Sequence, residues 1–163
     1  MRKTPAILLG FLFVVGLALA VEPPQMKEGL WSIRTQMTDN PGNVKSDFTQ
    51  KLCRSHAYDQ HAHELVKNMK GCKVVSENFT GGTYTVELEC NVLGTVIKSK
   101  STTTYQGDAT FHSVSHATNT PPLRGVSEST IIMDQKYLGA CPAGVEPGDR
   151  IAVDGSITHT WRH

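Results

Sequence analysis

Four cysteines and seven histidines carry the most specific chemistry in this chain. Cysteine thiols form disulfides or bind metal ions, and histidine binds metals or transfers protons near neutral pH. The cysteines are Cys53, Cys72, Cys90 and Cys141. No spacing among them is the C-x-x-C pair that is typical of zinc sites, so the cysteines favour disulfides over a metal site.

The histidine spacings also argue against a metal site. His61 and His63 lie on an expected helix, where they point about 200° apart. In an extended segment the same two rings would share one face and could bind a transition metal. His112 and His116 share a strand face but lie about 13 Å apart, which is too far to hold one metal ion. His159 and His163 have the same spacing. We interpret all seven as surface residues: His56, His61, His63, His112, His116, His159 and His163.

No enzyme signature occurs in the sequence. The G-x-S-x-G elbow, the H-E-x-x-H zinc motif, the P-loop and the dinucleotide-binding glycine pattern are all missing. Carboxylates such as Asp47, Asp59, Glu64 and Glu77 could act as acids or bases, yet no spacing singles out a pair. The sequence therefore predicts a non-catalytic protein without a cofactor or a bound metal.

Residues 72–90, CKVVSENFTGGTYTVELEC, place a cysteine at each end of an expected β-hairpin. With Thr80, Gly81 and Gly82 as a three-residue turn, Cys72 lies opposite Cys90 and the two can form a disulfide. Cys53 is then left to pair with Cys141. The same register places Val74 opposite Leu88, Ser76 opposite Val86 and Asn78 opposite Tyr84 on one mainly apolar face.

The rest of the chain reads as strands with one helix. Residues 55–70 carry apolar side chains at helical spacing, and Gly71 can end that helix. Pro121 and Pro122 mark a loop. Short connections between consecutive strands predict a single domain with a curved, antiparallel, mostly up-and-down sheet, one helix packed on it and two disulfides. The further strands are expected within residues 29–38, 44–53, 94–106, 109–118 and 125–141.

The first 20 residues are expected to be a signal peptide. A positive start at Arg2 and Lys3 precedes an uncharged apolar run, and residues 18–20 have the small-x-small pattern that signal peptidase accepts. The apolar run is shorter than the about 20 residues that span a bilayer. We therefore predict cleavage after Ala20, export to the periplasm, and no transmembrane segment in the product.

Removal of this segment leaves 143 residues, which is the size of one domain. The formal net charge is +1 for the whole chain and −1 without the first 20 residues, which hold two basic residues and no acidic one. Such a nearly neutral chain has no general attraction for nucleic acid, so no nucleic-acid partner is predicted.

Five motifs occur in order: EGLWSIRTQMT from Glu28, a cysteine before the helix at Cys53, GCKV from Gly71, VELEC ending at Cys90, and KYLGACPAG around Cys141. Over residues 24–144 they resemble the bacterial exported family known as domain of unknown function 3617. The resemblance implies export to the envelope of Gram-negative bacteria and a disulfide-bearing, β-rich domain. It supplies no established activity and no catalytic residue.

The chain departs from the pattern of that family in two places. Its middle strands have fewer methionines and glycines, and a further segment follows the last motif. We therefore expect a β-rich domain over residues 21–144 and a C-terminal extension over residues 145–163. Apolar residues alternate in this extension, for example Ile151 and Val153, so it could add one more strand or form a poorly ordered end.

Two functional hypotheses follow for such a domain. A curved sheet with a helix on its concave side makes a binding module for an apolar small molecule, a lipid or a peptide, with Trp31, Tyr84, Phe111 and Met133 as strand residues suited to line it. Plain core packing also accounts for each of these four. The alternative is an envelope accessory protein that acts through protein contacts, for example by edge-strand pairing. The ligand and the partner are not identified by the sequence.

Overall fold

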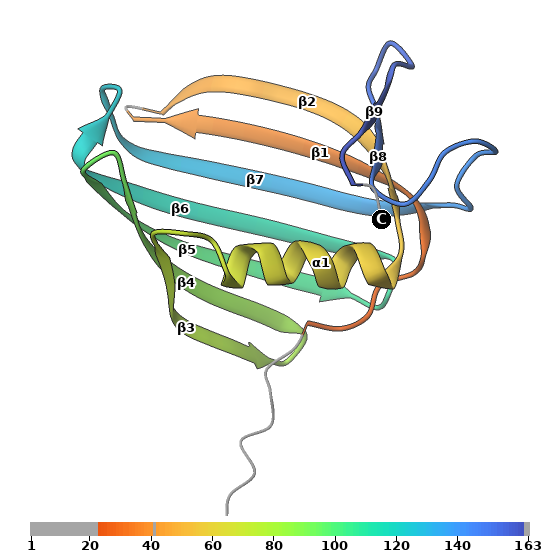
Figure 1. Ribbon diagram of the computed structural model, residues 1–163, viewed down its shortest axis with the longest axis horizontal. Helices are drawn as coiled ribbons and strands as arrows, with labels where there is room; N and C mark the ends of the chain where they lie inside the picture. The colour runs from red at the N-terminus through yellow and green to blue at the C-terminus, as the bar shows by residue number, and fades with distance from the viewer. Residues whose placement is uncertain (1–22, 41, 162–163) are drawn as a thin grey trace, which may run out of the picture.

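The computed structural model describes residues 23–40 and 42–161 as one antiparallel sheet of nine strands with one helix (Figure 1). The expected signal peptide, residues 1–20, lies outside the described residues. Strand order across the sheet is β3-β4-β5-β6-β7-β1-β2-β8-β9. The elements are β1 (Gly29–Asp39), β2 (Asn43–Arg54), α1 (His56–Lys67), β3 (Cys72–Thr80), β4 (Thr83–Val92), β5 (Thr95–Gln106), β6 (Thr110–Leu123), β7 (Val126–Gly139), β8 (Asp149–Ile151) and β9 (Ile157–His159).

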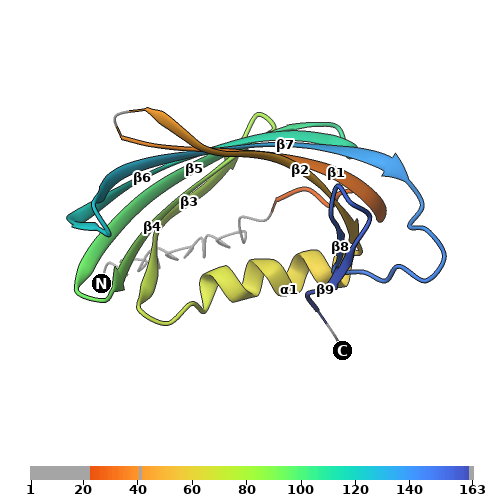
Figure 2. The same ribbon diagram turned by 90° about the horizontal axis from the view of Figure 1, so that it is seen from above.

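The predicted fold class is confirmed. Strands β3 to β7 form an up-and-down meander, and β1 then pairs with β7 on one side and with β2 on the other. The sheet is curved, and α1 lies across its concave side (Figure 2). Ser55 caps the start of the helix by accepting a hydrogen bond from the Tyr58 N–H (3.2 Å).

The two faces of the sheet differ in chemistry because side chains alternate along each strand. On β1, Trp31 and Ile33 point to the concave side and are buried. Arg34 points to the convex side and forms an ion pair with Asp47 on β2 (2.8 Å). The convex face also carries ion pairs such as that of Lys100 with a glutamate of β4, and it is therefore the solvated face.

A small aromatic core lies at one end of the concave side. The Trp31 ring centroid is 5.8 Å from that of Phe111 and 5.9 Å from that of Tyr137, and Tyr105 contacts Phe111 at 5.4 Å. Met26 is buried in the same cluster. The Trp31 Nε1–H donates to the carbonyl oxygen of Lys27 (2.9 Å), which satisfies the one polar group of this buried ring.

The β3–β4 hairpin departs from the predicted register near its turn. Cys72 lies opposite Cys90 as predicted, but Val75 has no opposite partner and forms a β-bulge. Beyond the bulge the strands are joined by a two-residue turn, Gly81-Gly82, rather than by three residues. Both glycines have positive φ (58° and 76°), which this turn requires and only glycine adopts without strain.

The bulge changes which side chains of β3 reach the concave side. Glu77 and Phe79 take the places predicted for Ser76 and Asn78. The predicted pairings beyond the bulge were wrong, and the observed ones are Glu77 with Val86 and Phe79 with Tyr84.

Two other expectations are modified by the structure. Pro121 and Pro122, predicted as a loop, lie within the last residues of β6, where pairing with β7 is interrupted between Thr118 and Leu123. Proline has no N–H to donate to a ladder, and it is tolerated there because the pairing is interrupted. In the extension 145–163, two strands of three residues each are found.

The extension is fastened to the end of β2. Asp149 is buried, accepts a hydrogen bond from the Glu146 N–H (2.9 Å) and lies 2.6 Å from Nδ1 of His159. Trp161 packs on Tyr58 of the helix at 5.7 Å between ring centroids. The extension therefore closes over the start of α1.

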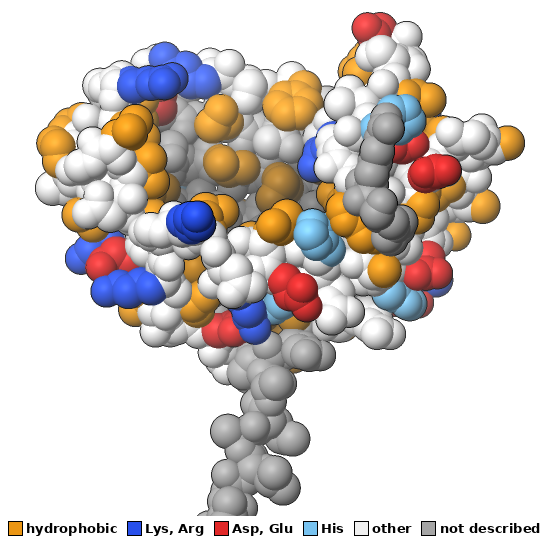
Figure 3. Space-filling model, viewed as in Figure 1, with side chains coloured by type: hydrophobic (Ala, Val, Ile, Leu, Met, Phe, Trp, Pro, Cys, Tyr) orange, Lys and Arg blue, Asp and Glu red, His pale blue; other side chains and the backbone are white. Residues whose placement is uncertain are grey.

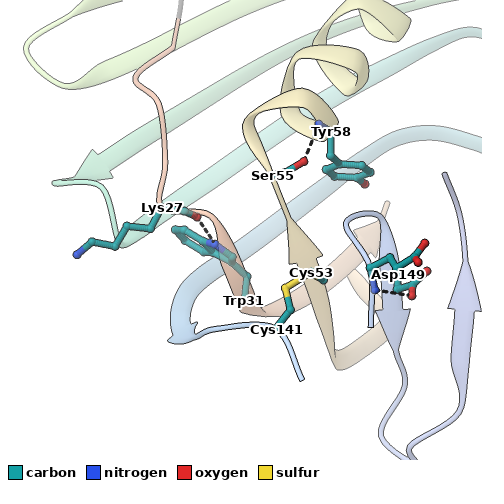
Figure 4. Close-up of a disulfide and its surroundings, with 8 residues drawn as sticks. Lys27, Trp31, Cys53, Ser55, Tyr58, Cys141 and Asp149 are labelled. Atoms are coloured by element: carbon teal, nitrogen blue, oxygen red, sulfur yellow. Dashed lines mark hydrogen bonds between the residues drawn. A yellow bond between two sulfur atoms is a disulfide. The ribbon is translucent and has the colours of Figure 1, made fainter. Parts of the chain in front are cut away.

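Two disulfides flank the helix. Cys53–Cys141 joins the end of β2 to the segment after β7 beside buried Trp31 (Figure 4), and Cys72–Cys90 joins the first residue of β3 to β4. The first closes a loop of 88 residues and the second a loop of 18 residues.

We predict that loss of the long disulfide destabilises the protein more. In the chain-entropy model, replacing Cys53 and Cys141 by serine lowers the free energy of unfolding by about 4.5 kcal/mol, whereas the same change at Cys72 and Cys90 lowers it by about 3 kcal/mol. Denaturant unfolding of the two double-serine variants measures both values. A larger loss for the hairpin disulfide would contradict this ranking.

Candidate functional site

A recess opens between the helix and the concave side of the sheet, and Figure 3 shows apolar side chains on its floor. We call this recess the hollow. It is bounded by the concave faces of β1, β7 and β6 and by α1. Its closed end holds the aromatic core around Trp31. Its distal end lies at the β1–β2, β4–β5 and β6–β7 turns, which the antiparallel order places together.

The floor of the hollow is apolar but only partly covered. Residues directly opposite one another on neighbouring strands share a face, so the pairings extend the face of Trp31 across β7 and β6. Met37 keeps 37% of its surface exposed. The apolar floor residues beyond the aromatic core are Ile33, Met37, Ala117, Ile131 and Met133.

Small hydroxyl side chains line the floor beside this apolar strip. The Ser101 hydroxyl donates to that of Ser115 (2.8 Å), and the hydroxyl oxygens of Thr103 and Ser113 lie 2.9 Å apart. These groups pair with each other across β5 and β6, so their polarity is satisfied within the floor. Their small size leaves the space between sheet and helix unfilled.

The helix presents an apolar wall that the described chain covers only in part. Leu65, Val66 and Met69 are 57%, 39% and 50% exposed, and none of the residues of α1 is buried. His63 and Lys67 approach Glu77 on β3, so helical spacing turns the apolar stripe toward the hollow. An apolar stripe on a helix ordinarily packs against the core, and here it borders open space.

An arginine covers the closed end. The Arg54 guanidinium lies 4.9 Å above the Trp31 ring and 5.3 Å above the Phe111 ring. It donates to Asp59 on α1 (2.8 Å) and to the side-chain oxygen of Gln135 (3.3 Å). Its side chain is only 12% exposed, and its charge is balanced by the aspartate. The aromatic end is thus sealed and neutral.

A polar cluster joins the other side of the helix to the sheet. The Tyr84 hydroxyl donates to the Glu77 carboxylate, Lys67 Nζ lies 3.5 Å from the same carboxylate, and His63 Nε2 lies 3.8 Å from it. Burial, and then the hydrogen bond to Glu77 and its negative charge, raise the pKa of Tyr84 well above its usual value. Tyr84 therefore stays protonated and keeps donating at any physiological pH.

The histidines lie at separate places. His61 stacks on Trp161 and His63 belongs to the polar cluster, while His56 Nε2 lies 2.9 Å from the Met26 carbonyl oxygen. His112 and His116 lie on the convex face, with partners on β7. His159 holds Asp149, and His163 lies outside the described residues. In the described part of the chain, no three His, Cys, Asp or Glu residues are placed to hold a metal ion.

Two further recesses are shallow and partly polar. One of about 290 Å³ lies beside the Cys72–Cys90 disulfide and includes Lys73 and Glu89. The other, of about 270 Å³, lies at the distal end around Asp39 and Glu128. Neither recess combines the apolar side chains of the sheet with those of the helix, as the hollow does.

Three of the four residues predicted to suit an apolar site occupy two different parts of the hollow. Trp31 and Phe111 form its sealed end, and Met133 lies on its open floor. Tyr84 instead belongs to the polar cluster. The sequence marks Glu77 only as one of several carboxylates, and its inward position was missed because the bulge was not predicted. Arg54 was missed because it precedes the helix cap without a motif of its own.

We predict that the Tyr84–Glu77 hydrogen bond stabilises the attachment of the helix. Tyr84→Phe removes a hydrogen bond to a partly buried carboxylate and should lower the free energy of unfolding by about 1.5–3 kcal/mol. Tyr105→Phe is the matched control, since burial also raises the pKa of that phenol but no hydrogen bond of its hydroxyl is found among the described residues.

Alkaline pH gives a second readout of the same contact. Because folding raises the pKa of Tyr84 above 10.0, its contribution to stability is complete below pH 10 and is lost at higher pH. Denaturant unfolding at pH 9 and pH 11 should show a smaller pH effect for Tyr84→Phe than for the unmodified chain. Equal pH effects in both would contradict the assignment.

Comparisons with known proteins place most of the chain within a family. No curated protein matches the chain. The model of a family described as "Protein of unknown function (DUF3617)" matches residues 26–141, from buried Met26 to Cys141, and leaves out β8 and β9. Within the described residues, no helix is long and apolar enough to cross a membrane. Because the family model matches most of its length, the chain belongs to the DUF3617 family of proteins of unknown function.

Proposed function

We propose that this protein is a non-catalytic periplasmic binding module that holds an apolar ligand in the hollow. One observation carries the proposal: the apolar stripe Leu65, Val66 and Met69 is exposed although it borders an apolar floor. A ligand between the two would remove both surfaces from water, which stabilises a complex by about 25 cal/mol per Å² of apolar surface.

The architecture supports an occupant rather than collapse of the helix onto the floor. The helix is fixed by disulfides just before and just after it and by the polar cluster on its β3 side. It therefore does not depend on packing of its apolar stripe. Concave, mainly apolar recesses with a few polar groups at their edges are the usual form of small-molecule sites.

Export to the periplasm is supported by the two disulfides, because such bonds persist in oxidising compartments. The N-terminal pattern of a signal peptide points the same way. An extracytoplasmic protein that shields an apolar molecule from water has an evident use, since lipids and other apolar compounds dissolve poorly between membranes.

A second candidate function rests on the free edge of β2. Only Lys51 and Leu52 pair with β8, so residues 43–50 have an unpaired outer edge in the described chain. Val44 and Phe48 are 68% and 45% exposed along it. A strand of a partner protein could add to this edge, as in other recognition by strand addition.

We predict that filling the hollow abolishes binding of an apolar probe. Ala117→Trp places a large ring on the floor, whereas Thr118→Trp places the same ring on the convex face of the same strand. The fluorescence of N-phenyl-1-naphthylamine should rise with the unmodified chain and with Thr118→Trp, and should rise at least tenfold less with Ala117→Trp.

A second pair of variants covers the case in which the tryptophan on the floor prevents folding. Leu65→Glu puts a charge on the helix wall at an exposed position, and Gln60→Glu puts one at an exposed position about 140° away around α1. Only the first should weaken probe binding. Unchanged probe binding in a folded Ala117→Trp variant and in Leu65→Glu would overturn the proposal.

Native mass spectrometry of protein purified from its own host would then identify a partner protein bound at the edge of β2.

A further inference from the structure

The dimensions of the hollow favour a long, narrow occupant. Beyond the sealed aromatic end, from the row of Ile33 to the row of Met37, the floor extends four residues along β1, or about 13 Å at the rise of a strand. This is the length scale of much of an extended fatty acyl chain. Methionines at positions 37, 69 and 133 line the open part, and their flexible side chains adapt to a chain without a fixed shape.

The floor offers little to a peptide backbone. The inner strands β4 to β7 and β1 already hydrogen-bond to neighbours on both sides. The hydroxyls of Ser101 and Ser115, and those of Thr103 and Ser113, bond to each other. A peptide in the hollow would bury backbone N–H and C=O groups without partners, which is costly, whereas a hydrocarbon chain has no such groups.

The two ends of the hollow differ in charge. At the closed end, the cation of Arg54 is balanced by Asp59 at 2.8 Å. At the distal end, Lys70 follows the helix and Arg124 lies in the β6–β7 turn, both exposed. Neither forms an ion pair with another described residue. Figure 3 shows basic side chains at the upper left of the hollow and directly below its left part.

Other groups at the distal end do not cancel this charge. Lys45 lies 3.5 Å from Asp39, and Lys67 lies 3.5 Å from Glu77, so these acidic groups already have cations. Glu128 points to the convex face, opposite Thr118. A basic edge beside an apolar recess matches a molecule with a hydrocarbon chain and a negative head.

We infer that the ligand is a single-chain amphiphile with an anionic head, whose chain lies along the floor toward Trp31 and whose head lies at the distal end near Lys70 and Arg124. This inference rests on the proposed apolar site and adds the chemical class and the orientation of its ligand.

Three amphiphiles with the same tail test the head group. Myristate, tetradecanol and tetradecyltrimethylammonium are compared by displacement of N-phenyl-1-naphthylamine, each below its micelle concentration. Myristate should bind most tightly and the cationic compound least tightly. The preference for myristate should shrink as salt is added, because exposed charges are screened.

Charge-removing variants locate the head. The double variant Lys70→Gln/Arg124→Gln should weaken myristate binding by about three- to tenfold, which is the range expected for two exposed charge contacts, and leave tetradecanol unchanged. Lys51→Gln/Lys136→Gln removes the same charge from exposed lysines of the convex face and should change neither.

The outcomes separate this inference from the proposed function. Equal binding of the three amphiphiles, or an equal effect of the two double variants on myristate, overturns the anionic head and its position while the apolar site stands. If the probe binds but none of the three amphiphiles displaces it, the inferred ligand is wrong. If the probe itself does not bind, the proposed apolar site is wrong.

Discussion

The covalent bonds on either side of α1 determine how the rest of the structure is arranged. Cys53 lies just before the helix and is joined to Cys141, and Cys72 lies just after it and is joined to Cys90. With both ends fixed to the sheet, the helix does not need a buried face, and it has none. Most helices in globular proteins owe their stability to an apolar face packed on a core. Here the disulfides and the cap at Ser55 replace much of that packing, and the apolar stripe is left free.

The noncovalent contacts between the helix and the sheet follow the same pattern, since those described are polar and lie at the margins of the helix, whereas the C-terminal extension adds the ring packing of Trp161 on Tyr58 and His61. Arg54 and Asp59 hold its first turn over the aromatic core, and the carboxylate of Glu77 gathers Tyr84, Lys67 and His63 on its β3 side. Hydrogen bonds and ion pairs fix position well but bury little apolar surface. A helix that is held in this way can stand away from the sheet. The sheet below it contributes small hydroxyl side chains where the helix passes, so the hollow results from both partners.

Sequence reasoning predicted the fold class, the helix and the opposition of Cys72 and Cys90, because these depend on local patterns. Alternation marks strands, helical spacing marks α1, and opposed cysteines mark a hairpin. The proline pair at the end of β6 and the two short strands after β7 depend instead on long-range pairing, which no local pattern encodes. The candidate site was predicted only in part. Trp31, Phe111 and Met133 were named, but the exposed helix stripe was expected to pack on the sheet, since periodicity reveals an apolar face and not whether anything covers it.

The position of Glu77 shows where a closer reading of the sequence would have succeeded. Two cysteines that face each other across β3 and β4 require one register, and a two-residue Gly81-Gly82 turn requires a register that differs by one residue. Both are strong signals, since glycine pairs favour such turns and cross-strand disulfides need directly opposed residues. The disulfide and the two-residue turn are compatible only if one strand has an extra residue between the cysteine pair and the turn. The conflict between the two registers therefore predicts a bulge. Its placement at Val75 reverses the side to which the next residues point. That reversal brings a carboxylate beneath the helix, and thereby gives α1 the polar attachment that leaves its apolar stripe facing the hollow.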